Sequence, residues 1–228
     1  MYNGSIMEGG GRMQHLVDEA LRYMGVRALA GEELRSQLEA LACEISSQFT
    51  PQSTWRMFPM QHDERGILLG NIHLTGRSAA RILAECDRCA VMVCTLGAGF
   101  DAWLRRMQAR DMTRAVMLDA LGSAFVEEIC DKTGQEIAKR FPEHYLTDRF
   151  SPGYGDLPLA LQPRLLSVAE AHRIGVHATD TCMLTPQKSV TALIGVAATP
   201  QAARIRGCTH CSMNKTCTIR KAGMTCDL

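Results

Sequence analysis

The longest helical pattern in the sequence runs from Thr113 to Arg140, and it limits how the rest of the chain can pack. Its first half carries apolar residues on every side: Val116, Met117, Ala120, Leu121, Ala124, Phe125, Ile129 and Cys130. A helix that is apolar all round is normally buried. Lys139 and Arg140 suit the negative end of a helix, and Pro142 stops its continuation. We therefore expect a central buried helix with the other elements packed around it.

The segments on either side of this helix predict a mixture of strands and helices. Apolar and β-branched runs predict strands at 67–69, 72–74, 90–96 and 189–197. Apolar residues at helical spacing predict helices at 13–24, 34–45 and 159–174. Ser78 and Asp101 precede two shorter helical patterns and are the expected N-caps.

The composition excludes several classes of function. The chain has 228 residues, 46% of them hydrophobic, and a net charge of +1, which gives no electrostatic case for binding nucleic acid or an anionic membrane. No apolar run approaches the roughly 20 residues that span a bilayer, and the first residues do not resemble a signal peptide. We expect a cytoplasmic protein whose ten cysteines are thiols or metal ligands. Cys86, Cys89 and Cys94 fall in apolar patterns and are expected to be buried thiols.

A loop of unusual composition follows the long helix, from Arg149 to Pro158. It reads Arg-Phe-Ser-Pro-Gly-Tyr-Gly-Asp-Leu-Pro, with two prolines and two glycines. Prolines fix φ and remove donors, whereas glycines permit positive φ and close backbone approach. Arg149 adds a planar cation suited to a carboxylate. The segment is either a plain surface turn or a shaped ligand-binding loop.

The order of residues in this loop resembles a known binding motif. Arg149, Gly153, Tyr154 and Pro158 match the pattern Arg-x3-Gly-Tyr-x3-Pro of the activation (reactivation) domain of cobalamin-dependent methionine synthase, where it binds S-adenosylmethionine. The family continues Pro-Asp-His, whereas this chain continues with Leu and Ala.

Two further segments resemble the same domain. The family carries Ile-Gly, then Thr-Glu-Ser, then Pro-x2-Ser-Val-Ser-Gly, and this chain has similar residues at 174–175, 179–181 and 186–192, with Ala192 replacing the glycine. The segment Ala124–Glu127 is similar to an Ala-Phe-x-Glu segment upstream of the family's loop. The resemblance spans roughly Glu127 to Gly195.

The resemblance implies an α+β fold, with a curved, mostly antiparallel sheet packed with helices. We expect three parts: an N-terminal helical hairpin at 1–50, an activation-domain-like core at 51–200, and a Cys-rich metal-binding tail at 201–228.

The resemblance also implies a binding site. S-adenosylmethionine would lie against the loop, with its carboxylate on Arg149, its amino group on Glu127 and its adenine on backbone groups of Ile194 and Gly195. The implied ligand-binding residues are Glu127, Arg149, Phe150, Ser151, Gly153, Tyr154, Ile194 and Gly195. No catalytic side chain is expected, because the nucleophile would be the reduced cobalt of cobalamin carried by a partner.

The C-terminal segment has the spacing of a metal site. Cys208, Cys211, Cys217 and Cys226 follow the pattern Cys-x2-Cys-x5-Cys-x8-Cys, and four thiolates can hold zinc or an iron–sulfur cluster such as 4Fe–4S. Spacing does not choose between the metals, and His210 could replace one cysteine. A need for electrons in cobalamin reactivation favours the iron–sulfur cluster.

These observations predict a reactivation subunit for a cobalamin-dependent methionine synthase, part of a methyltransferase system of methionine biosynthesis. Its partners would be the methionine synthase core protein and a reduced flavodoxin or ferredoxin. Three alternatives stay open: an iron–sulfur electron-transfer or scaffold protein, a reactivase for another corrinoid methyltransferase, and a zinc-stabilised module that binds S-adenosylmethionine.

Overall fold

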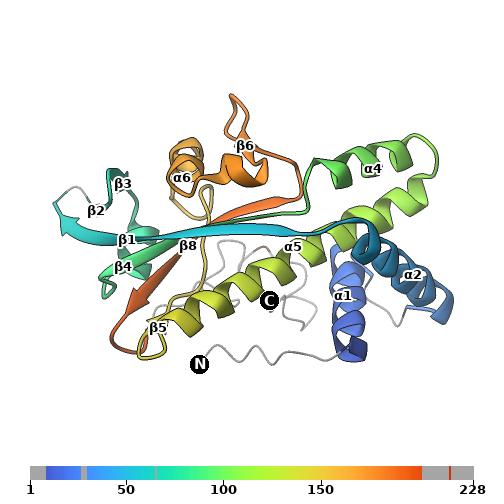
Figure 1. Cartoon of the computed structure of the whole chain (residues 1–228), viewed down its shortest axis with the longest axis horizontal. Helices are drawn as coiled ribbons and strands as arrows, with labels where there is room; N and C mark the ends of the chain where they lie inside the picture. Colours follow the sequence, from blue (N-terminus) through green and yellow to red (C-terminus); the bar gives the residue numbers. More distant parts are fainter. Residues whose placement is uncertain (1–8, 27–29, 65, 202–215, 217–228) are drawn as a thin grey trace.

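A six-stranded sheet forms the centre of the molecule (Figure 1). The structure is a computed structural model that describes residues 9–26, 30–64, 66–201 and Thr216. The strand order is β3-β2-β1-β4-β8-β5, and every neighbouring pair is antiparallel. The strands are β1 (Gln52–Asp63), β2 (Gly66–Leu69), β3 (Ile72–Leu74), β4 (Arg88–Thr95), β5 (Tyr145–Leu146) and β8 (Ser189–Ala197). The expected α+β class with an antiparallel sheet is confirmed.

The long helix α5 (Met112–Arg140) runs along one face of the sheet (Figure 1). Its buried residues share one hydrophobic core with three other helices and with the facing side chains of β4 and β8. Those helices are α1 (Gly9–Tyr23), α2 (Glu32–Gln48) and α4 (Ala98–Gln108). The predicted central buried helix is confirmed. It begins at Met112, one residue before the predicted start at Thr113, and its N-cap is Asp111, whose carboxylate accepts a hydrogen bond from the Arg114 N–H at 3.0 Å.

Close packing at the centre of α5 depends on a glycine. A Cβ atom added at Gly122 would lie 2.7 Å from two ring atoms of Phe100, which is fully buried. Helix α4 therefore approaches α5 more closely than any larger residue would permit.

A second hydrophobic core covers the opposite face of the sheet, where α6 lies in Figure 1. It contains residues of α3 (Arg77–Ile82), α6 (Gln162–Val168) and the hairpin of β6 (His177–Ala178) and β7 (Leu184–Thr185). The single helix predicted over 159–174 is wrong in detail. Two 3-10 helices, Leu159–Leu161 and Ala171–Ile174, flank α6, and the left-handed backbone of Glu170 (φ 53°) interrupts the helical geometry.

Both expected N-caps take part in tertiary contacts instead. The N-cap of α3 is Gly76, one position before Arg77, and Ser78 lies within the helix. Asp101 lies in the first turn of α4, where its buried carboxylate accepts a 2.6 Å hydrogen bond from the Gln187 N–H. These local predictions were wrong because the partners come from distant parts of the chain.

The three cysteines of the apolar patterns are buried, as predicted: Cys86, Cys89 and Cys94 are at most 3% exposed. Burial raises the pKa of the Cys86 thiol to about 11. Across the described residues, no helix combines the length and apolar character needed to cross a membrane.

Candidate functional site

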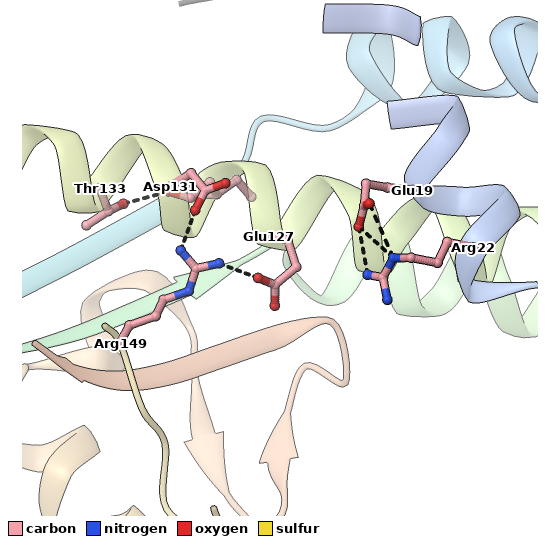
Figure 2. A network of polar contacts seen from close by, with 7 residues as sticks. Glu19, Arg22, Glu127, Asp131, Thr133 and Arg149 are labelled. Atoms are coloured by element: carbon pink, nitrogen blue, oxygen red, sulfur yellow. Dashed lines mark hydrogen bonds and ion pairs between the residues drawn. The ribbon is translucent and has the colours of Figure 1, made fainter. Parts of the chain in front are cut away.

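Arg149 lies between two carboxylates of α5 (Figure 2). One guanidinium nitrogen donates to Glu127 and the other donates to Asp131 at 2.5 Å. Glu127 and Asp131 are four residues apart, so their side chains lie on the same side of the helix. The structure thus brings together Arg149 and Glu127, two of the residues predicted from the sequence, and adds Asp131.

The Arg149 guanidinium is the most enclosed member of this triad. Its side chain is 8% exposed, whereas those of Glu127 and Asp131 are 30% and 44% exposed. Burial alone lowers the pKa of Arg149, but Cys130, Glu127 and Asp131 together raise it above its ordinary value. Arg149 is therefore a fixed cation that can bind an anion and cannot transfer a proton.

The neighbouring Phe150 fixes the backbone position of Arg149. Phe150 is 3% exposed, and its N–H and C=O exchange hydrogen bonds with Leu193 of β8, at 3.1 and 2.8 Å. These bonds attach the beginning of the loop to the sheet. Phe150 has a structural role in this arrangement, and its bonds hold Arg149 beside β8.

The centre of the loop turns sharply at Gly153. Its φ of 86° lies in the left-handed region that glycine favours, and its N–H donates to Leu157 at 2.8 Å. The Tyr154 N–H donates to Ser151 at 3.0 Å, and the Tyr154 side chain is 44% exposed. The loop therefore presents an aromatic side chain at the surface.

The end of the loop is attached to the N-terminus of α3. The Asp156 carboxylate accepts hydrogen bonds from the N–H groups of Arg77 at 2.7 Å and Ser78 at 2.9 Å. Hydrogen bonds from Ser78 and Arg77 lower the pKa of Asp156 to about 2. A Cβ at Gly76 would lie 2.8 Å from the Asp156 carbonyl oxygen, and one at Gly155 would lie 2.6 Å from the Ser78 hydroxyl. We call this contact between 76–78 and 155–156 the clasp.

Ile194 and Gly195 lie inside the sheet, away from its free edges. Ile194 is 3% exposed, and both backbone groups of Gly195 are bonded to Thr147: its N–H donates to the hydroxyl at 2.9 Å and its C=O accepts from the N–H at 3.0 Å. A ligand could use these Gly195 groups only by displacing Thr147. The expected adenine contacts at Ile194 and Gly195 remain a prediction.

A second polar contact lies further along α5. Lys188, which precedes β8, donates to Asp119 and to Ser123, both at 2.9 Å, and its side chain is 11% exposed. Asp119 and Ser123, together with Glu127 and Asp131, form a stripe on α5 with a spacing of four. Sequence reasoning missed Asp119, Ser123, Asp131 and Lys188, although the four-residue spacing from Glu127 was a usable signal.

A hollow of about 290 Å³ opens beside this stripe. Tyr23 of α1 and Asp119 and Ser123 of α5 are among its lining residues. Its volume is near the lower end of ligand pockets, which span roughly 300–1,000 Å³. Ser123 is the lining residue of α5 nearest in sequence to Glu127, which lies one helical turn further on. A larger hollow of about 690 Å³ lies beside the first turns of the same helix, around Glu44 and Arg114. Among the described residues, none of the predicted ligand-binding residues lines either hollow.

The predicted metal site lies outside the described residues. Cys208, Cys211, Cys217, Cys226 and His210 are all in the part of the tail whose structure is not described. Within 9–26, 30–64, 66–201 and Thr216, no three His, Cys, Asp or Glu side chains form a group that could hold a metal ion. The tail site therefore stays a prediction.

Comparison with known proteins finds a solved structure with a similar fold. No family model and no curated protein matches the sequence. By its fold the chain is an α+β domain, with an antiparallel sheet covered on one face by a long helix. This fold is similar to that of a solved structure described as the MetH reactivation domain bound to AdoHcy. The match covers 93% of this chain and 83% of that chain, with a TM-score of 0.65 and 14% sequence identity. The resemblance noted in the sequence motifs is thus confirmed for the fold.

Proposed function

We propose that this chain binds S-adenosylmethionine at Arg149 and presents its methyl group to cobalamin on a partner methionine synthase protein. One observation carries the proposal: a buried, permanently charged Arg149 opens the motif-bearing loop, in a fold whose solved neighbour binds AdoHcy. The ligand class follows from the chemistry of the site, since a guanidinium recognises carboxylates in a planar, two-pronged geometry.

The two carboxylates beside Arg149 fit the rest of an amino-acid head group. A bound amino acid carries a carboxylate and an ammonium group on one carbon. The ligand carboxylate would replace Glu127 or Asp131 on Arg149, and the displaced side chain would then accept from the ligand ammonium. Arg149 keeps two carboxylate partners throughout this exchange, so the buried cation is never left unpaired.

Catalysis in this proposal consists of positioning. The loop is fixed at its start by Phe150 and at its end by Asp156, which leaves little freedom for a ligand held between them. Tyr154 is exposed on the same loop, so a bound methyl group there would be accessible to a docked partner. Cobalamin on the partner would accept the methyl group, and this chain's residues would bind and orient the donor.

The source of electrons forms a separate part of the proposal. Reactivation would need one electron, from a reduced flavodoxin or ferredoxin or from an iron–sulfur cluster on Cys208, Cys211, Cys217 and Cys226. Iron, sulfide and zinc analysis of the anaerobically purified chain tests the tail directly.

Calorimetric titration with S-adenosylmethionine tests the binding site. The experiment compares wild type, Arg149→Ala and Arg114→Ala. Arg114 is the control because it is also an arginine paired with a glutamate of another element: it lies in the first turn of α5 and pairs with Glu44 of α2, away from Glu127 and Asp131. Loss of a charge-assisted contact should weaken binding roughly 10- to 100-fold in Arg149→Ala, with little change in Arg114→Ala. Equal affinity for the wild type and a folded Arg149→Ala would refute the proposed site.

A further inference from the structure

Two cysteines face each other between the sheet and the long helix. Cys94 belongs to β4 and Cys130 to α5, and both are free thiols that are fully buried in the same hydrophobic core. The Cys94 sulfur lies 3.5 Å from the hydroxyl of Thr133, which is two residues beyond Asp131 on α5 (Figure 2). Thr133 and Cys130 are three residues apart and therefore lie side by side on the surface of α5 that faces Cys94. The two thiols are in contact, and they hydrogen-bond to each other.

The surroundings of this pair favour a thiolate on Cys94. Burial alone raises the pKa of a cysteine, as it does for Cys86 and Cys89 in the other core. At Cys94 the hydrogen bond from Cys130 lowers the pKa despite burial, and the charge of Arg149 acts in the same direction. The same hydrogen bond raises the pKa of Cys130, which keeps the proton that it donates. A thiolate beside a proton donor and a cation is typical of reactive cysteines.

We propose that Cys94 and Cys130 form an oxidation site, at which hydrogen peroxide converts the two thiols to a disulfide between β4 and α5. The oxidant must be small, because neither sulfur is exposed and an oxidant as large as oxidised glutathione could not reach them. Hydrogen peroxide is close to water in size, so brief local openings of the core admit it. This inference does not depend on the proposed function, because the thiol chemistry needs no ligand at Arg149.

The reaction balances with peroxide as the only oxidant. The Cys94 thiolate attacks one oxygen of hydrogen peroxide, the O–O bond breaks, and the hydroxide that leaves takes up the proton that Cys94 had released. The Cys130 sulfur then attacks the sulfenic acid on Cys94, so that an S–S bond forms and the S–O bond breaks. The departing hydroxide leaves as water with the Cys130 proton. Overall the two sulfurs lose two electrons, and peroxide is reduced to two molecules of water.

The disulfide would alter the surroundings of Arg149 from within the core. Cys130 directly precedes Asp131, which pairs with the Arg149 guanidinium. Oxidation would attach this segment of α5 to β4, and it would remove the thiolate charge that Arg149 attracts. The modification would therefore affect the Arg149 triad without changing any of its three side chains.

Peptide mapping of the full-length protein tests the inference. Native protein is treated with hydrogen peroxide, the remaining thiols are alkylated in denaturant, and the chain is digested with trypsin. Trypsin releases Cys94 in the peptide 89–105 and Cys130 in the peptide 115–132. Native wild type should give these two peptides joined, and reduction should separate them. In concentrated urea each of the ten cysteines can choose among nine others, so the native yield should exceed the yield in urea severalfold.

The peptide 89–105 also contains Cys89, so the position of the link needs its own measurement. Fragmentation of the joined peptides in the mass spectrometer distinguishes Cys94 from Cys89 in the wild type, whether or not a variant folds. The variant Cys89→Ser is the matched control and should keep the joined peptides, whereas Cys94→Ala and Cys130→Ala should each abolish them.

Three results would overturn the proposal. They are the absence of joined peptides in the native wild type, a link on Cys89, and a yield in urea equal to the native yield. Equal yields from peroxide and from oxidised glutathione would refute the requirement for a small oxidant. A native link on Cys94 and Cys130 that forms with peroxide and hardly at all with oxidised glutathione would support the inference.

Discussion

Replacing Gly195 with alanine tests whether this residue is fixed by packing. A Cβ at Gly195 would lie 2.6 Å from the Cys86 sulfur, 2.6 Å from a methyl carbon of Leu83 and 3.0 Å from a methyl carbon of Thr147. All three side chains are buried, at 3%, 0% and 2% exposure. None can move into solvent, so the added methyl group must displace part of the core between β8 and α3.

The cost can be bounded from known substitutions. Overpacking a core destabilises a protein by about 1–3 kcal/mol. Alanine also lowers the conformational entropy of the unfolded chain, which stabilises the folded state by about 0.4–1 kcal/mol. Because the added methyl group meets three buried side chains at once, we take the upper half of the overpacking range, about 2–3 kcal/mol, and expect a net loss of roughly 1–2.6 kcal/mol in the free energy of unfolding. With a urea m-value of about 3 kcal/mol/M, the midpoint should fall by about 0.3–0.9 M at unchanged m.

Two further variants make this measurement specific. Gly31→Ala is the control, because a Cβ there meets no atom of the described residues within 4 Å, and its stability should change by less than about 0.5 kcal/mol. Cys86→Ala removes the sulfur that the new methyl group meets. The double variant Gly195→Ala/Cys86→Ala should therefore lose less than the sum of the single losses, by about 0.5 kcal/mol or more. A neutral Gly195→Ala, or strict additivity with Cys86→Ala, would refute the packing argument.

Two other substitutions test the packing of α5 and the clasp. Gly122→Ala should lower the urea midpoint, because the new Cβ would meet the buried Phe100 ring at 2.7 Å. The higher helix propensity of alanine offsets about 1 kcal/mol of this loss. An unchanged or raised midpoint would contradict the close approach of α4 to α5. Asp156→Asn should destabilise at neutral pH. The folded pKa of about 2 lies below the ordinary 3.8, so the ionised Asp156 stabilises the fold above about pH 4 and this contribution disappears as the pH falls through about 2. Urea midpoints of both proteins between pH 2 and 7 should converge at the acid end, and a constant difference would argue against the ionised cap.

Regular elements with a strong local pattern were predictable from the sequence. The strand at Ser189–Ala197 and the helix ending at Arg140 appear with the predicted bounds. Strand β1 was missed, because polar residues and Pro59 interrupt its apolar pattern. The sheet stabilises it nonetheless, since β1 pairs with β4 on one side and β2 on the other. Tertiary pairing of this kind leaves no local trace in the sequence.

The site was only partly predictable for the same reason. The motif identified Arg149 and suggested Glu127, which the structure places in one ion-pair cluster. The motif gave no indication that Asp131 would also pair with the Arg149 guanidinium, or that Lys188 would pair with an acid of α5. Ion pairs between elements depend on the orientation of side chains about α5, and this becomes known only when the loop and β8 have been placed against the helix.

The contacts that hold the loop also determine when it can form. Asp156 bonds to the start of α3, at Arg77 and Ser78, which are synthesised 79 and 78 residues before it. Phe150 pairs with Leu193 of β8, which is synthesised later. A nascent chain therefore contains the whole Arg149 triad well before it can hold the loop in place, because β8 must first join the sheet. The proposed ligand site would be among the last parts to assemble on the ribosome, and a fragment that ends before β8 would carry the motif without the strand that holds the loop in place.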